Sequence, residues 1–140
     1  RYVRSDEYRM WLPSDIANDP VAAEIFKVQV EAAEEAQRKL VAHFKLDEPD
    51  TPFSRKKHVT SALRRIAPSG MGTAMVWTAN FRILRHVIEM RTHPEAEEEL
   101  RLVFGKVAKR AIEEWPNVFG DLQIQIVNDL PWYSTEHTKV

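Results

Sequence analysis

Four polar residues near the middle of the chain have the types and spacing needed to bind an anionic, planar ligand. Asn80 precedes a run in which Arg82 and His86 are four positions apart, and Arg91 follows within about a turn. On a helix, residues four apart lie on the same face. Arginine presents a planar fork of donors that matches phosphates and carboxylates, and asparagine and histidine add further hydrogen-bonding groups. The stretch therefore predicts a site for a ligand that carries negative charge and hydrogen-bonding groups.

The elements expected to position these side chains are a β-strand and a helix that follows it directly. Residues 72–79 form a short segment rich in Thr, Met, Val and Trp after the breaker Pro68-Ser69-Gly70, which favours a strand. Asn80 is a preferred N-cap residue. Three apolar residues beyond it share one helical face: Phe81, Leu84 and Ile88. We therefore predict a junction from strand to helix at Asn80.

Length and composition indicate one globular domain over residues 1–140. The chain has 44% hydrophobic residues, a net charge of −1 and no cysteine. The charge gives no global basic field for nucleic acid, and the absence of cysteine excludes disulfides and thiolate catalysis. No apolar run approaches the roughly 20 residues of a membrane-spanning helix. We expect a soluble, cytoplasmic protein without a nucleic-acid or membrane partner.

Three further helices are predicted from capping signals and helical periodicity. Asp19-Pro20 opens a long helix to about Lys45, and Thr51-Pro52 opens a second to about Ile66. The last runs from about Pro94 to Trp115, and Thr92 with Glu95 resembles a capping box before it. The apolar stripe of the first helix is expected to comprise Ile25, Val28, Ala32, Ala36, Leu40 and Phe44. That of the last is expected to comprise Ala96, Leu100, Val103, Val107, Ala111 and Trp115.

The C-terminal part is less clearly patterned. Residues 117–130 are ambiguous, because residues 118–122 suit a helical turn whereas residues 123–127 alternate weakly. The end of the chain, from Pro131, is polar and is predicted to fray.

The central stretch resembles the C-terminal half of the flavin-dependent thymidylate synthases, the ThyX family. That family has an Arg, a Pro four residues later, a Trp-Thr-x-Asn strand end, then x-Arg-x-Leu, a His or Asn, and a closing Arg. This chain has Arg64, Pro68, the run at 77–80, Arg82-Ile83-Leu84, His86 and Arg91 at the same spacing, without gaps. Arg1-Tyr2 resembles the end of the family's upstream motif. The resemblance covers nearly the whole chain, weakly over residues 14–60.

The resemblance implies specific roles for these residues. Arg1, Arg64 and Arg91 match arginines that bind the uridine nucleotide, and Arg91 lies at the uracil ring and is the expected catalytic residue. Flavin-binding positions of the family are matched by Asn80, Arg82 and His86. FAD, methylenetetrahydrofolate as carbon donor, and dUMP or UMP as substrate are implied with them. The expected chemistry is C5 methylation of the uridylate by positioning and electrostatic activation.

The chain also departs from the family pattern. The family's Arg-His-Arg segment, which forms part of the flavin site, does not occur in the sequence. Glu95 and Glu97 stand where a His and a Gln are expected, and the glycine-rich residues 69–72 replace an apolar run. A remodelled pocket of this kind would fit relatives that methylate UMP in nucleoside-antibiotic pathways, so both UMP and dUMP stay open as substrates.

Other interpretations of the same residues compete with this one. Arg82 and His86 are also typical of the solvated face of a helix, and Arg64-Arg65 of a solvated helix end. A non-catalytic helical module that binds nucleic acid or an acidic partner is the main alternative, although the net charge of −1 argues against it. No metal site is predicted, because the remaining histidines lack metal-ligand spacing: His43, His58, His93 and His137.

The fold class that follows is α+β. We expect a mostly helical C-terminal part of a ThyX-like domain, with three long helices and a central helix packed on a sheet that a missing N-terminal segment completes. The resemblance also implies a homotetramer with active sites shared between subunits. On this interpretation the chain alone is an incomplete enzyme, and mixing it with an N-terminal fragment should restore flavin binding.

Overall fold

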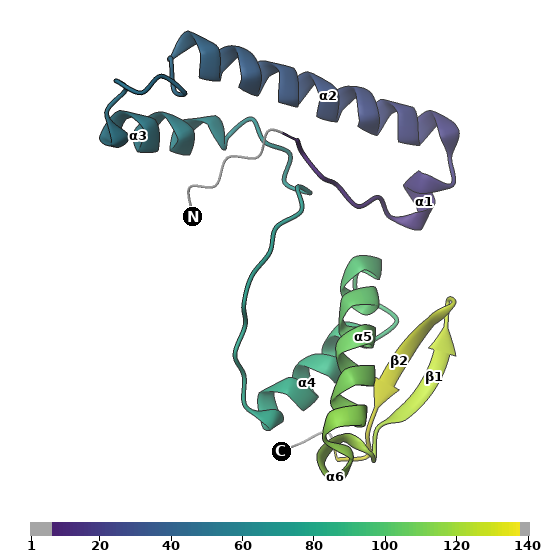
Figure 1. The fold of residues 1–140 in the computed structure, drawn as a ribbon. Helices are drawn as coiled ribbons and strands as arrows, with labels where there is room; N and C mark the ends of the chain where they lie inside the picture. The colour runs from purple at the N-terminus through teal and green to yellow at the C-terminus, as the bar shows by residue number, and fades with distance from the viewer. Residues whose placement is uncertain (1–6, 138–140) are drawn as a thin grey trace. The chain divides into compact units, whose positions relative to one another are not determined.

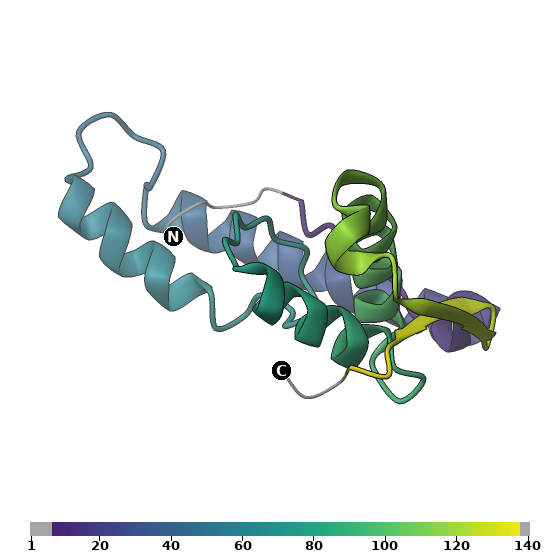
Figure 2. The same cartoon turned by 90° about the horizontal axis from the view of Figure 1, so that it is seen from below.

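The computed structural model describes residues 7–137, and the chain falls into two compact units (Figures 1 and 2). The first extends to Ala74 and the second begins at Met75. Helices and one small antiparallel sheet make up the described part, which confirms the α+β class. The predicted nucleotide-binding residue Arg1 lies outside the described residues. None of the described helices is long and apolar enough to cross a membrane.

The first unit contains helices α1 (Ser14–Ala17), α2 (Pro20–His43) and α3 (Phe53–Leu63). The predicted start of α2 is confirmed, because the Asp19 carboxylate accepts the N–H groups of Val21 at 2.9 Å and Ala22 at 3.1 Å. For α3 the predicted cap is wrong. Pro52 occupies the N-cap position, and the Thr51 hydroxyl instead donates to the Lys45 carbonyl at 2.6 Å.

Helix α3 packs alongside the C-terminal half of α2 (Figure 1). Four buried side chains form this contact: Val41, Leu46, Val59 and Leu63. The predicted stripe of α2 is confirmed at its C-terminal end, where Leu40 and Phe44 pack against this cluster, and is wrong at its N-terminal end, where Ile25, Val28 and Ala32 are exposed. The fully buried row of α2 consists of Ala33, Gln37 and Val41. The 24 residues of α2 extend well past the 11 of α3. The row is also shifted because the Tyr8 hydroxyl donates to Gln37 at 2.7 Å.

The predicted strand at residues 72–79 is not formed. Met71 makes one isolated bridge with Met10, and the Gly72 N–H donates to the Arg9 carbonyl at 2.7 Å. The rest of the segment is a connector without a strand partner in the described part of the chain (Figure 1). Met75 and Val76 are 82% and 100% exposed there. β-propensity reflects how well side chains pack on a neighbouring strand, and these residues lack such a neighbour.

The second unit contains helices α4 (Phe81–Thr92), α5 (Glu98–Glu114) and α6 (Pro116–Phe119), followed by strands β1 (Gln123–Val127) and β2 (Leu130–Ser134). The strands form an antiparallel hairpin, which resolves the ambiguous region in favour of β-structure. Its two-residue turn has positive φ at Asn128 and Asp129, the geometry of a type I′ turn. The predicted fraying from Pro131 is wrong for residues 131–134, because β2 packs against α4 and α5; residues 138–140 lie outside the described part of the chain.

The core of this unit lies between the helices and β2. Its buried members are Ile88, Ala108, Ala111, Phe119, Leu122 and Tyr133. The predicted face of α4 is confirmed: Ile88 is fully buried, Leu84 packs against the core, and the Phe81 ring contacts that of Phe119 edge-on at 5.7 Å. Burial of this face fixes which side of α4 remains open to solvent.

Two predictions for the region between α4 and α5 are corrected. Thr92 does not cap α5, which begins at Glu98; it is the buried last residue of α4, and its hydroxyl donates to the Ile88 carbonyl at 2.8 Å. The predicted stripe of α5 is correct in part: Val107 packs against the core, whereas Val103 and Trp115 are exposed. Ala111 is buried as expected, but the other buried residues are Arg101, Gly105 and Ala108. Small residues allow close approach of the hairpin, since a Cβ at Gly105 would lie 3.1 Å from Cγ of Pro131.

The buried side chain of Arg101 connects α4, α5 and the hairpin. Its Nε donates to the Thr92 carbonyl at 3.3 Å. Its Nη2 donates to the carbonyls of Val127 at 2.7 Å and Leu130 at 3.1 Å, on either side of the hairpin turn. An unpaired buried carbonyl is costly, so this one guanidinium both satisfies three acceptors and holds the turn against the helices.

We expect Arg101→Met to lower the free energy of unfolding by about 2–3 kcal/mol, because methionine fills space but leaves the three carbonyls without this donor. Urea denaturation followed by circular dichroism would measure the change. Arg110→Met is the matched control on the same helix, since Arg110 is exposed and pairs only with Glu113 and Glu114. A loss of less than about 0.5 kcal/mol is expected for the control. Equal losses for the two variants would contradict the role assigned to Arg101.

Candidate functional site

The polar residues of the predicted site lie on or beside α4. The predicted N-cap is confirmed: the Asn80 side-chain oxygen accepts the Ile83 N–H at 2.9 Å. This bond uses the oxygen of the amide and leaves its NH₂ group to donate elsewhere. Arg82, His86 and Arg91 are all exposed, on the part of α4 that the core does not cover. These three side chains are therefore open to solvent, and their roles in binding a ligand stay predictions.

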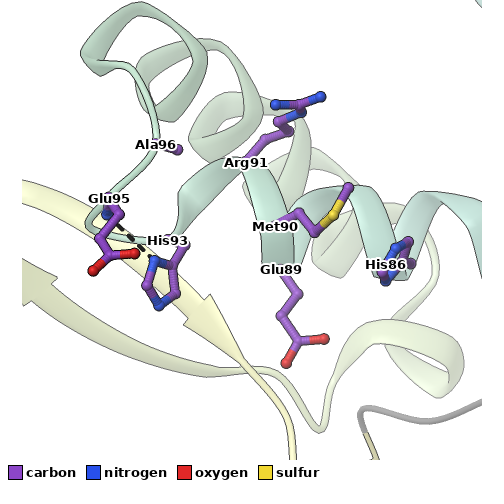
Figure 3. A pocket seen from close by; sticks show the side chains of 7 residues that line it. All are labelled: His86, Glu89, Met90, Arg91, His93, Glu95 and Ala96. Atoms are coloured by element: carbon purple, nitrogen blue, oxygen red, sulfur yellow. Dashed lines mark hydrogen bonds between the residues drawn. The ribbon is translucent and has the colours of Figure 1, made fainter.

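An open hollow of about 590 Å³ lies at the C-terminal part of α4 (Figure 3). Its lining residues are His86, Glu89, Met90, Arg91, His93, Glu95 and Ala96. Two predicted site residues, His86 and Arg91, are thus brought together in one depression. Asn80 and Arg82 belong to the same helix region but do not line the hollow. The lining of the hollow thus includes one arginine, two histidines and two carboxylates.

Three polar residues of the lining were not among the predicted site residues. Glu89, His93 and Glu95 contribute most of its remaining polar groups. Nδ1 of His93 accepts the backbone N–H of Glu95 at 3.3 Å (Figure 3). The His93 ring lies edge-on to that of Trp132, with 5.3 Å between the ring centroids. A neutral imidazole that accepts at Nδ1 carries its proton at Nε2. His93 follows Arg91 by two residues at the end of α4, and that proximity was the only signal for it in the sequence.

The remaining predicted residues lie elsewhere. Arg64 is exposed at the C-cap of α3 and belongs to the first unit, whereas Asn80, Arg82, His86 and Arg91 belong to the second. The described residues contain no group of three or more His, Cys, Asp or Glu that could hold a metal ion.

An ion pair fixes α4 on its side nearest the C-terminal hairpin. Arg85 donates from both terminal nitrogens to the Asp121 carboxylate, at 2.7 and 2.6 Å, and also to the Val118 carbonyl. The Thr135 hydroxyl donates to the same carboxylate at 2.7 Å. The hydrogen bonds from Arg85 are the main cause that holds the pKa of Asp121 well below its usual value, and the bond from Thr135 adds to them. Partial burial of the carboxylate acts in the opposite direction and raises the pKa. The pKa of Arg85 is raised by the same pairing.

Comparison with known proteins identifies relatives over most of the chain. The family model described as thymidylate synthase complementing protein matches residues 1–117. Proteins named flavin-dependent thymidylate synthase align with 92% of the chain and 52% of their own length, at 32% identity in Corynebacterium diphtheriae and 30% in Mycolicibacterium vanbaalenii. The one from Mycobacterium avium is 29% identical over the same shares. The chain therefore spans about half the length of the curated relatives it matches.

The Arg85–Asp121 pair gives a pH dependence of stability. Because the folded-state pKa of Asp121 is depressed, its contribution is complete above the unfolded-state pKa of about 3.9 and is lost as the pH falls through the folded-state value. Asp121→Asn should cost about 1 kcal/mol at pH 7, a value reduced for the partial exposure of the carboxylate. Urea unfolding would measure the difference in the free energy of unfolding between the natural protein and Asp121→Asn. That difference should be smaller at pH 3 than at pH 7. A difference of the same size at both pH values would contradict this role of the pair.

Proposed function

The chain belongs to the flavin-dependent thymidylate synthase family, and from this we propose that it supplies part of an active site that converts dUMP to dTMP. The observation that carries the proposal is the hollow on α4, where His86 and Arg91, two residues of the family pattern, line one open depression. The relatives are named as thymidylate synthases, which supports dUMP as the substrate over UMP. Because the chain spans about half of their length, the activity is proposed for the protein together with the rest of such a site.

The residues at the start of α4 have the chemistry needed to hold a flavin dinucleotide. The Asn80 NH₂, the Arg82 guanidinium and His86 are exposed groups able to donate hydrogen bonds. They suit the phosphates and ring carbonyls of FAD, since charge-assisted bonds to phosphate are strong. When bound and reduced, the flavin supplies the hydride and methylenetetrahydrofolate supplies the carbon. The protein's contribution is to bind, orient and shield these groups.

Arg91 is the proposed catalytic residue for the nucleotide. Carbon 5 of the uracil ring is a weak nucleophile, and the chain has no cysteine with which to activate it covalently. A guanidinium placed against the uracil carbonyls stabilises negative charge that develops on the ring. Arg91 is exposed in the hollow and free to present its planar fork to such a ring. Arg64 and Arg1 are proposed to bind the nucleotide phosphate, following the family pattern.

The connector at residues 72–79 is proposed to become a strand in the complete protein. Its apolar side chains are exposed, and its backbone lacks a strand partner within residues 7–137. Unpaired extended segments are templates for strand addition. A strand from outside this chain would complete the sheet that the resemblance implies, within a homotetramer whose subunits share active sites.

Arg91→Lys tests the division of roles. Lysine keeps the positive charge but loses the planar fork, so turnover of dUMP should fall by about a hundredfold while flavin stays bound. Turnover and flavin absorbance of the complete protein would be measured together, with Arg110→Lys as a surface control. If the variant instead loses flavin and turns over normally once flavin is resupplied, Arg91 belongs to the flavin site and the assignment is wrong.

Asn80→Asp separates flavin binding from helix capping. Aspartate is as favourable an N-cap residue as asparagine, so the stability of the protein should change little. The substitution does, however, replace the donating NH₂ group with a negatively charged oxygen. Flavin affinity should then fall by about tenfold or more, as judged by fluorescence titration. Asn80→Ala, the comparison variant, should also lose about 1 kcal/mol of stability. Unchanged flavin affinity in Asn80→Asp would show that the amide acts only as a cap.

A further inference from the structure

The hairpin of the second unit has one closed edge and one open edge. β2 packs against α4 and α5 (Figure 1). Its outer edge is blocked, because Pro131 has no N–H to donate and the Tyr133 N–H already donates to the Thr92 hydroxyl at 3.0 Å. β1 has no other strand beside it among the described residues. Any further strand can therefore join this hairpin only along β1.

The register shows which backbone groups of β1 face the open edge. Ile124 lies opposite Tyr133 and Ile126 opposite Pro131. Tyr133 gives its N–H to Thr92, so these are the non-hydrogen-bonded pairs of the ladder. This is the pattern expected one and three positions from Val127 and Leu130, the hydrogen-bonded pair that flanks the two-residue turn. The N–H and C=O groups of Ile124 and Ile126 consequently point away from β2, toward the open edge.

β1 lacks the features that usually protect an edge strand. Its sequence, Gln-Ile-Gln-Ile-Val, contains no charge and no proline. Ile124 and Ile126 are 55% and 68% exposed. They lie on the same face of the sheet as Tyr133 and Pro131, which contact the helices, but β1 extends beyond the helical cover. Two apolar side chains and four backbone hydrogen-bonding groups are thus left open together.

The strand is also complementary to itself. If two copies run antiparallel about a two-fold axis at Gln125, Ile124 of each faces Ile126 of the other and Gln125 faces Gln125. Ile124 and Ile126 then form hydrogen-bonded pairs with their outward backbone groups, and their side chains form one apolar row. No like charges meet, because the strand is uncharged. A two-fold interface requires such self-complementarity.

We propose that β1 pairs antiparallel with β1 of a second copy of this chain, about Gln125, to form a continuous four-stranded sheet. The helices of both copies then lie on one face of this sheet, and the isoleucine row fills the gap between them. Two five-residue strands bury less area than a standard stable interface, so this pairing is weak by itself and adds to other subunit contacts. It is independent of the proposed catalytic function.

A disulfide across the two-fold axis tests the pairing directly, because the natural chain has no cysteine. Opposed residues in a non-hydrogen-bonded pair have Cα atoms about 4.5 Å apart, within the range that a disulfide spans. Gln125→Cys should therefore give a cross-linked dimer on a non-reducing gel after mild oxidation with copper phenanthroline. Gln123→Cys is the matched control: in this register the two copies of residue 123 lie four residues apart, about 13 Å, and cannot be bridged.

A second variant tests the isoleucine row. Ile126→Lys in the Gln125→Cys background should slow cross-linking by about tenfold, because lysine is a natural guard of edge strands. Ile126 is exposed, so the fold should survive, and circular dichroism would verify this. Equal cross-linking of Cys variants at 125 and 123 would indicate random collision and overturn the proposal. The absence of a cross-link at position 125 would also overturn the proposal, and is the result expected if another segment covers β1. An unchanged rate of cross-linking in the Ile126→Lys variant would overturn it as well.

Discussion

The second unit depends on the buried guanidinium of Arg101. This side chain of α5 donates to carbonyls at the end of α4 and on both sides of the hairpin turn, and so joins two helices to the hairpin. The face that α5 turns to the core includes two small side chains, Ala108 and Ala111, which allow the strands to approach. Close approach brings backbone carbonyls out of water, and each needs a donor. Arg101 meets that need from one position on α5, and the packing of the hairpin follows from it.

The orientation of α4 follows from the same contacts. Thr92 at its end accepts from β2, and Arg85 on its flank pairs with Asp121 beyond α6. Ile88 is buried between these two polar contacts. With the helix held on that side, His86 and Arg91 are directed to solvent and line the hollow. The hollow is therefore positioned by residues that do not line it, and rigid secondary structure carries four of its seven lining residues.

The sequence predicted the helices well and their partners poorly. Asp19 and Asn80 are caps that act within a few residues, so their signals are local and correct. Residues 72–79 have the composition of a strand, but a strand requires a neighbour that composition does not reveal. Thr92 looked like a cap because Glu95 follows it, yet its hydroxyl bonds across to Tyr133, which no local pattern indicates. The same reason applies to the site: His86 and Arg91 came from motif spacing, whereas His93 and Glu95 depend on how the chain turns after α4.

The polar contacts that hold α4 have a consequence for protein synthesis. Thr92 and Tyr133 are 41 positions apart, Arg85 and Asp121 are 36 apart, and Arg85 and Thr135 are 50 apart. In each case the residue on α4 is made first. As the chain leaves the ribosome, the helix with its site residues therefore emerges before any of these partners exists. It has its own N-cap at Asn80, which needs no later residue than Ile83, but its apolar face must wait for Phe119 and Tyr133. Until then that face is a surface for chaperones, and the site is assembled only when the hairpin arrives.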